Sequence, residues 1–352
     1  MKLSLTALAI ATTTLLVGCG GGDSSSSSPA PSTGKFSLGV SDAPVDDAQK
    51  VVLGFKDVVL VPIDPQSGEK IGEHILLDVS KPEGTLRQID LMQYQGSNAE
   101  TIIRDYEIKT GHYAMCLYAK DGLFLNDDST SYVQRVDGSL KGLVVPNRGS
   151  CFGFKPLDPD QGTLAFAKPS ESIEIVAGIN SYIVEFDLRT ALTDPQGLDH
   201  MLMNRNGVTL INASQAGHIR GNVNPTQYQA CEADSASYNA IGNADPVHAV
   251  YLYAGSRDRT TMGDVGATGE RQAPVAVATV VTGQDQSGDT TYSYEFGHVG
   301  AGTYSIGYTC TAYIDQPSTE ETEQEGFLIY QHYTPVDVEE GQYTEQNIDP
   351  IL

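Results

Sequence analysis

The sequence has no tryptophan and few cationic residues, and these shortages narrow the functions open to the chain. Lysine and arginine together number 21 against 45 aspartate and glutamate residues, so the formal net charge is −24 at pH 7. A surface of that sign repels the phosphates of nucleic acids and anionic lipid headgroups. We therefore expect no nucleic-acid partner, and the simplest use of the acidic surface is solubility.

Signatures of the common enzyme classes are also missing. There is no G-x-S-x-G elbow, no H-E-x-x-H helix and no phosphate-binding P-loop. The cysteines form no C-x-x-C pair, and the seven histidines are scattered without the spacing of metal ligands. We expect no cofactor and no metal ion. A catalytic triad assembled in space from the many serines and aspartates stays open.

The sequence lacks an apolar run long enough to span a bilayer, which takes about 20 residues. Residues 3–17 form a shorter apolar stretch behind Lys2, as in the hydrophobic region of a signal peptide. Residues 16–19, Leu-Val-Gly-Cys, resemble the lipobox of bacterial lipoproteins. That resemblance implies that residues 1–18 are removed as a signal peptide and that Cys19 carries fatty acyl chains such as palmitate. An ordinary secretory signal that contains a cysteine is the alternative.

Residues 19–34 are rich in glycine, serine and proline and offer little to bury. This composition predicts a flexible tether between a lipid anchor and a folded body. Gly20, directly after the acylated cysteine, favours the outer membrane if the host is Gram-negative. We therefore expect a lipid-anchored protein of the cell envelope, at the outer membrane, on either its periplasmic or its external face.

The four remaining cysteines are an even number in an exported chain, which suggests disulfide bonds. Three pairings are open among Cys116, Cys151, Cys231 and Cys310. We favour sequential pairing, because it keeps each bridge within one half of the chain. Free buried thiols are the less favoured alternative in an oxidising compartment.

Alternating apolar and polar residues dominate the sequence after the tether. Phe36, Leu38 and Val40 begin this pattern, and similar strand-like runs recur to the C-terminus. Residues 97–106 are an exception, because Ser97 or Asn98 could cap a helix there. The predicted fold class is all-β.

The two halves of the chain repeat one pattern of glycines and apolar residues. One set, at a constant offset, matches Ile108, Gly111, Tyr113, Met115 and Leu117 with Val299, Gly302, Tyr304, Ile306 and Tyr308. A second set matches Gly34, Phe36 and Val40 with Gly217, Ile219 and Val223. The repeat predicts two tandem β-sandwich domains, residues 35–213 and 217–352. Chance similarity between strand patterns is the alternative.

The first half resembles a bacterial and archaeal family known only as a domain of unknown function, family 4382. The likeness covers roughly residues 34–213, and its clearest parts are 34–48 and 182–189. It implies an envelope location but no activity. The second half resembles the small prealbumin-like, carboxypeptidase-regulatory β-sandwiches, on residues 217–223, 250–253, 296–304 and 336–342. Such modules are mostly noncatalytic spacers or binding surfaces.

A few polar groups could carry chemistry. The acidic segments 41–47, 126–129 and 158–162 could offer carboxylates to calcium, although turns are the simpler interpretation. Asp187 and Arg189 lie two apart on an expected strand, so they would share a face as a buried structural pair or a binding pair. Several tyrosines could stack on sugars, but their strand-like alternation favours core positions. They are Tyr251, Tyr253, Tyr304 and Tyr308.

The expected function is therefore a noncatalytic role in binding, adhesion or assembly at the cell surface or in the periplasm. The expected partners are the membrane, through the anchor, and a polysaccharide or an envelope protein. A hydrolase of envelope or environmental polymers is one alternative. A calcium-stabilised structural module is the other.

Overall fold

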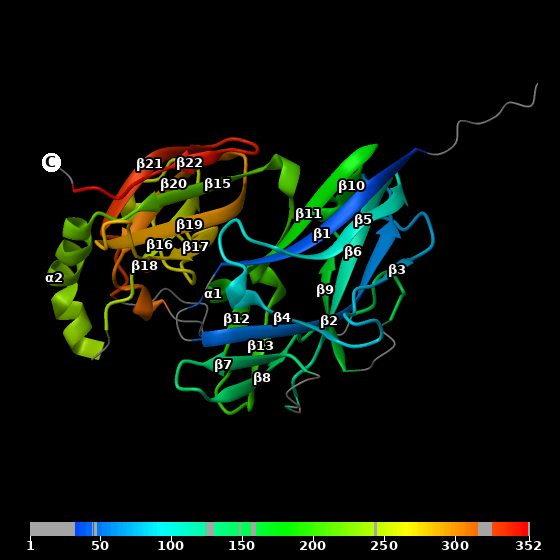
Figure 1. Cartoon of the computed structure of the whole chain (residues 1–352), viewed down its shortest axis with the longest axis horizontal. Helices are drawn as coiled ribbons and strands as arrows, with labels where there is room; N and C mark the ends of the chain where they lie inside the picture. The colour runs from blue at the N-terminus through cyan, green and yellow to red at the C-terminus, as the bar shows by residue number, and fades with distance from the viewer. Residues whose placement is uncertain are drawn as a thin grey trace, which may run out of the picture. The chain divides into compact units, whose positions relative to one another are not determined.

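The computed structural model describes residues 32–350, except 44, 46–47, 124, 126–129, 148, 156–159, 243–244 and 316–325, and it leaves out the side chains of 236–242. Residues Ser32–Leu352 form one compact unit. Within it, four sheets are arranged as two β-sandwiches (Figure 1). The all-β sandwich architecture predicted from the sequence is thus confirmed, whereas the predicted domain limits stay predictions.

The first sandwich combines a four-stranded sheet with a ten-stranded one. The smaller sheet has the order β14 (Val208–Asn212), β11 (Gly178–Asp187), β1 (Thr33–Ala43) and β5 (Glu100–Lys109). The larger has the path β10 (Ile173–Ile175), β6 (Gly111–Lys120), β2 (Ala48–Pro62), β7 (Tyr132–Arg135), β8 (Leu140–Val144), β13 (His200–Met203) and β12 (Leu192–Thr193). Off this path, β3 (Ile75–Asp78) and β4 (Arg87–Asp90) pair with β2, and β9 (Gln161–Phe166) pairs with β6.

The core of the first sandwich follows directly from the alternation in β1. Phe36, Leu38 and Val40 are fully buried because alternate side chains of a strand face the same side. The neighbouring strand β11 runs parallel to β1 and adds Val184 and Phe186 to the same core. The expectation that these alternating residues form a core is confirmed.

The second sandwich is built from two four-stranded sheets. One has the order β18 (Val281–Gln284), β19 (Thr290–Gly300), β15 (Ala216–Asn222) and β22 (Tyr343–Glu345). The other has the order β17 (Ala276–Thr279), β16 (Ala249–Ala254), β20 (Gly302–Thr309) and β21 (Gln331–Val338). The 3₁₀ turn Ala213–Gln215 leads from β14 of the first sandwich to β15 of the second.

The predicted repeat appears in the strand pairing. Strand β1 lies between the parallel β11 and the antiparallel β5, and β15 lies likewise between the parallel β22 and the antiparallel β19. Gly34 pairs with Ile108 in one half, and Gly217 pairs with Val299 in the other. The residues matched by sequence therefore occupy equivalent places in two similarly connected sandwiches.

A tyrosine at the start of the equivalent strands β6 and β20 makes the same hydrogen bond in both halves. The Tyr113 hydroxyl donates to the Lys109 carbonyl at 2.7 Å, and the Tyr304 hydroxyl donates to the Gly300 carbonyl at 2.8 Å. Each bond reaches back four residues across a tight hairpin turn. This arrangement resembles the tyrosine corner of other β-sandwiches and fixes the entry into the strand.

The helix expected over residues 97–106 is wrong. The structure has β5 from Glu100 to Lys109, paired antiparallel with β1. The β-branched residues Thr101, Ile102 and Ile103 favour a strand, and the open edge of β1 supplies its hydrogen-bond partners. The polar residues Ser97 and Asn98, taken as a helix cap, lie in the preceding turn.

The longest helix, α2 (Pro225–Gly242), was not expected from the sequence. Its start has recognisable chemistry, because the Asn224 side chain accepts from the Thr226 backbone N–H at 2.9 Å and proline occupies the first helical position. The other α-helix, α1 (Leu188–Ala191), is a single turn after β11.

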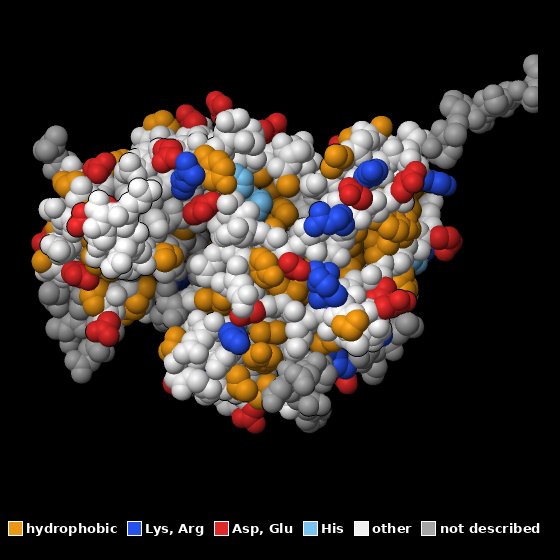
Figure 2. All heavy atoms as spheres, in the orientation of Figure 1, with side chains coloured by type: hydrophobic (Ala, Val, Ile, Leu, Met, Phe, Trp, Pro, Cys, Tyr) orange, Lys and Arg blue, Asp and Glu red, His pale blue; other side chains and the backbone are white. Residues whose placement is uncertain are grey.

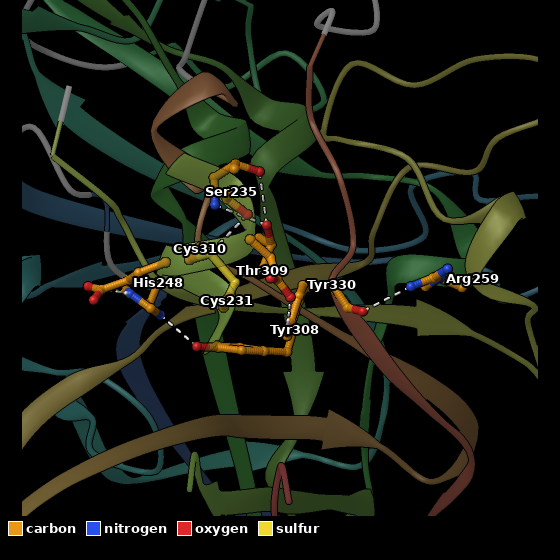
Figure 3. The surroundings of a disulfide bond; sticks show 11 residues. Cys231, Ser235, His248, Arg259, Tyr308, Thr309, Cys310 and Tyr330 are labelled. Atoms are coloured by element: carbon orange, nitrogen blue, oxygen red, sulfur yellow. Dashed lines mark hydrogen bonds and ion pairs between the residues drawn. A yellow bond between two sulfur atoms is a disulfide. The ribbon is translucent and has the colours of Figure 1, made fainter. Parts of the chain in front are cut away.

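The cysteines pair sequentially, as favoured. Cys116 of β6 bonds to Cys151 with a Cα–Cα distance of 6.0 Å, and Cys231 of α2 bonds to Cys310 with a Cα–Cα distance of 6.1 Å. The second bridge ties α2 to the residue after β20 (Figure 3). Cys19 lies outside the described residues.

Candidate functional site

The two sandwiches approach each other closely at two glycines. A Cβ placed on Gly297 of β19 would lie 1.8 Å from the carbonyl oxygen of Gly96. Next to this contact, the Ser97 backbone N–H donates to a carboxylate oxygen of Glu295 at 3.2 Å. The segment before β5 therefore packs directly on β19, and only glycine fits at the point of closest approach.

A buried arginine makes a second connection between the halves. Arg189 is 2 % exposed, and its guanidinium donates to the backbone carbonyls of Ala312 at 3.2 Å and Asp315 at 2.8 Å. The Asp315 carboxylate is itself buried and accepts from the Tyr251 hydroxyl at 2.9 Å. Burial raises the pKa of Asp315, and the charge of Arg189 opposes that rise. Arg189 therefore serves the contact between the sandwiches.

Asp187 and Arg189 do not share a strand face, so that expectation is wrong. Asp187 ends β11 and caps α1, accepting from the Thr190 backbone N–H at 3.2 Å and its hydroxyl at 2.8 Å. Arg189 belongs to the helical turn that follows. The chain leaves the strand at Asp187, so the period-two rule stops applying there.

Between the same two sandwiches lies a cleft of about 450 Å³. The first half contributes three carboxylic acids, Asp42, Glu185 and Asp187. The second half contributes a largely apolar wall that includes Leu252, Val275 and Val277, together with the 295–300 segment of β19. We call this space the interdomain cleft, and its two walls differ in chemistry.

The acids of the interdomain cleft are shifted toward their neutral forms. Burial, reinforced by the charge of Asp187, raises the pKa of Glu185 to about 8. Burial raises the pKa of Asp187 to about 6, although the hydrogen bonds from Thr190 oppose it. Burial and the charge of Glu185 also hold the pKa of Asp42 well above its usual range. Three like charges in one desolvated place cannot all ionise cheaply.

Some polar atoms of this cleft have no hydrogen-bond partner within the described part of the chain. They include both carboxyl oxygens of Asp42, which is fully buried, and one carboxyl oxygen of Glu185. A buried polar group without a partner costs about 1–3 kcal/mol. Native structures keep such groups rarely, and often where a ligand completes them.

His298 adds an unusual residue to the same wall. It is 8 % exposed, and its Nε2 atom has no hydrogen-bond partner among the residues that the structure describes. Burial, with help from the nearby His218, lowers its pKa to about 4, so the imidazole is neutral at pH 7. Its φ angle of 49° lies in the left-handed region that most side chains avoid. In the face drawn in Figure 2, histidine side chains gather beside hydrophobic ones near the middle of the molecule.

A second cluster looks like a catalytic array, but its histidine and one of its tyrosines are buried. His248 contacts the Tyr308 hydroxyl through Nδ1 at 2.6 Å and Glu232 through Nε2 at 3.3 Å (Figure 3). Tyr228 stacks on the His248 ring with centroids 3.4 Å apart. Tyr308 is fully buried, so its oxygen cannot reach a substrate. Burial lowers the pKa of His248 to about 4, and we assign this cluster to the attachment of α2.

The remaining sequence candidates gather into no metal centre in the described residues. Residues 126–129 and Asp158 lie outside the described part, as do 44, 46 and 47 of the first acidic segment. Asp160 forms an ion pair with Lys120 at 3.7 Å. Three of the four tyrosines, Tyr251, Tyr253 and Tyr308, are fully buried, which agrees with the core interpretation. The fourth, Tyr304, is partly buried and lines the interdomain cleft. No helix in the described ranges is long and apolar enough to cross a membrane.

Sequence reasoning missed Glu185 and His298. Glu185 stands in a strand between Val184 and Phe186, so alternation alone predicts an ordinary solvent-facing acid. It is partly buried in the interdomain cleft, whose other wall is the second sandwich, and local periodicity carries no information about that wall. Three residues that line the cleft were singled out in the sequence: Asp42, in the segment 41–47, Asp187 and Tyr304.

Comparison with known proteins finds one family in the first half of the chain. Residues 33–204 match a family described as a domain of unknown function (DUF4382). That match covers the first sandwich up to β13, close to the range expected from the sequence. No curated protein matches the chain.

Proposed function

We propose that this chain is a noncatalytic binding protein of the bacterial cell envelope and that the interdomain cleft is its binding site. The observation that carries the proposal is the set of polar atoms in that cleft that lack partners within the described residues, on Asp42, Glu185 and His298. A bound molecule would supply those partners. The backbone contact at Gly96 and the Arg189 connection would hold the two walls at a fixed separation.

The envelope location rests on the N-terminal sequence. A signal-like stretch, the cysteine of a lipobox at position 19 and a glycine- and serine-rich tether together favour a lipoprotein of the outer membrane. Two or more acyl chains on Cys19 would anchor it stably, at about 0.8 kcal/mol per buried CH₂. Partners are then a polysaccharide or an envelope protein within reach of the tether.

We further propose that the second sandwich is a prealbumin-like module. Its two four-stranded sheets and its short hairpins support that assignment. In this chain the module would supply the apolar wall of the interdomain cleft.

Mass spectrometry of the mature N-terminal peptide tests the anchor. We expect a chain that begins at Cys19 and carries fatty acyl groups, and Cys19→Ser should abolish both the modification and membrane association. An unmodified cysteine, or cleavage at another position, would contradict this part of the proposal.

Site-specific photocrosslinking in intact cells tests the binding role. A photoreactive residue at Val275, which is 52 % exposed on the rim of the cleft, should yield a reproducible adduct. The same residue at Val136, which is 58 % exposed and lies outside the cleft, is the matched control. Equal crosslinking at both positions, or none at Val275, would argue against a binding cleft.

The carboxyl pair favours one second candidate, a hydrolase. Glu185, with its pKa at about 8, and Asp187, with its pKa at about 6, have acidities pushed apart as in general acid and base pairs. Release of soluble fragments from envelope polysaccharide by the wild type but not by Glu185→Gln would support that candidate over the binding protein.

A further inference from the structure

The interdomain cleft is lined by acidic residues, three of them on one side. Asp42, Glu185 and Asp187 approach it from the first sandwich, and Glu295 lies on the opposite side. Neither lysine nor arginine is present among the described residues that line it. The nearest arginine in the sequence, Arg189, turns its guanidinium toward the carbonyls of residues 312 and 315 instead. Asp42, Glu185 and Asp187 therefore have no lysine or arginine beside them among the described lining residues.

His298 is a second and independent sign of a ligand. Its side chain is more than nine-tenths buried, lines the cleft, and leaves Nε2 without a partner in the described part of the chain. A neutral imidazole nitrogen can accept one hydrogen bond. An N–H donor in the cleft would satisfy it, whereas a bare carboxylate or phosphate oxygen has no proton to donate to it.

The apolar wall of the cleft indicates that the N–H donor of the ligand is attached to an apolar group. Val275 and Pro274 line the rim, and Ile211 lies on the side of the first sandwich. Such a surface gains from contact with a hydrocarbon body at about 25 cal/mol per Å² of apolar area removed from water. A hydrated divalent ion would gain nothing there, and in the described residues no three side chains are placed to coordinate one.

We propose that the interdomain cleft recognises an organic cation, a protonated amine or guanidinium carried on an apolar body. The cationic group would pair with Glu185 and Asp187 and donate to His298, and the apolar body would lie along Val275. This inference rests on the proposed binding function and names the chemical class of the ligand.

The test is calorimetric titration of the full mature chain, purified in detergent, at pH 8.5. The probes are 2-phenylethylammonium, its neutral analogue 2-phenylethanol and its anionic analogue phenylacetate. An alkylamine is still mostly protonated at that pH. We expect the ammonium probe to bind at least about tenfold more tightly than the neutral one, the ratio that one net ion pair of 1.4 kcal/mol gives. We expect phenylacetate to bind more weakly than either.

Three substitutions separate the effect of charge on binding from an effect on folding. Glu185→Gln keeps the shape of the side chain and should reduce the affinity for the ammonium probe toward that for 2-phenylethanol, with Asp187 retaining the rest of the preference. Glu83→Gln removes the same charge from an exposed loop and should change nothing. His298→Gln, which retains a hydrogen-bonding side chain, should weaken the ammonium probe more than the alcohol. Thermal melts of each variant verify that it is folded.

The outcomes distinguish this inference from the function on which it rests. Equal affinity for the ammonium and the alcohol would overturn the cation preference, while binding itself would still support a binding cleft. Saturable heat with calcium ions alone that is lost in Glu185→Gln would overturn it in favour of a metal site. No binding of any probe, together with no adduct at Val275, would overturn both.

Discussion

Glu185 lowers the free energy of unfolding by an amount that depends on pH. Its pKa is about 8 in the folded chain against an ordinary value of 4.5, so the folded state holds the proton more tightly than the unfolded state. Stability contributed by the neutral form is therefore fully present below pH 4.5 and is lost as the pH rises toward 8. A carboxyl with a depressed pKa would have the opposite dependence.

We predict that Glu185→Gln raises the free energy of unfolding at pH 8 by about 1–3 kcal/mol, since each pKa unit is worth about 1.4 kcal/mol. At pH 4.5 the variant and the wild type should be equally stable. Urea denaturation at both pH values measures this difference. Glu83→Gln, in an exposed loop, is the control, and an equal gain in that variant would contradict the assignment to burial.

At the residue scale, the sequence could predict the apolar core but not the acids of the cleft. Phe36, Leu38 and Val40 announce their burial through local alternation. Glu185 has the same alternation with a charged side chain on the other face, which normally means solvent exposure. Its surroundings depend on residues about 100 positions away, and no local rule contains them.

Among the elements, the equivalent hairpins β5–β6 and β19–β20 invite a direct comparison. Each places a tyrosine hydroxyl on a carbonyl four residues back, at Tyr113 and Tyr304. We predict that Tyr113→Phe and Tyr304→Phe each lower the free energy of unfolding by about 1 kcal/mol. Tyr113 should cost more, because it is 4 % exposed whereas Tyr304 is only partly buried.

Chemical denaturation of the two phenylalanine variants tests that order. Tyr106→Phe, an exposed tyrosine on β5, is the matched control and should leave stability unchanged. If all three variants lose the same stability, the corner hydrogen bonds are not responsible.

The two disulfides close loops of different length, with sequence separations of 35 and 79 residues. In the loop-entropy account each stabilises the chain by about 3–5 kcal/mol, and the longer loop by about 0.7 kcal/mol more. We therefore predict that replacing Cys231 and Cys310 by alanine costs more than replacing Cys116 and Cys151.

Thermal melts of the two double variants measure this difference. The Cys231 pair should also release α2, which hydrogen exchange of the helix amides would detect. Unchanged protection of those amides would show that the stacking of Tyr228 on His248 holds the helix without the bridge.

The sequence predicted strands better than helices for a physical reason. Residues 97–106 carry helix-start signals, but the open edge of β1 recruits them as β5. α2 has a cap at Asn224 and a proline at its start, but it lacks the continuous apolar stripe by which a helix is recognised in a sequence. The Cys231 disulfide and the stacking of Tyr228 attach it to the sandwich instead. Tertiary contacts decided both segments.

At the scale of the whole molecule, Arg189 joins the two sandwiches. Its guanidinium satisfies two carbonyls of the second sandwich from a helix of the first. We predict that Arg189→Ala lowers the free energy of unfolding by about 3–5 kcal/mol, because it leaves buried acceptors and the Asp315 charge without compensation. We also expect the wild type to unfold in one transition and the Arg189→Ala variant in two.

Differential scanning calorimetry resolves these transitions. Arg259→Ala is the matched control, since Arg259 also donates to a carbonyl, that of Tyr330, but is exposed. It should cost less than about 1 kcal/mol and keep one transition. A single unchanged transition in Arg189→Ala would mean that the sandwiches are coupled through other contacts.

The sequence predicted two sandwiches in tandem, but it could not predict the seam between them. The repeat is written in local patterns of glycine and apolar residues, which recur in both halves. The seam consists of single residues from distant positions, such as Ser97 and Glu295, whose meeting no pattern encodes.

The contact of Gly297 with Gly96 sets the distance between the two sandwiches. Because only a hydrogen atom fits at this point, any larger side chain at position 297 would push the two sandwiches apart, and by more the larger it is. Substituting Gly297 by alanine and then by valine would therefore widen the interdomain cleft in steps. The affinities of ligands of different width would report the width of the cleft in each variant.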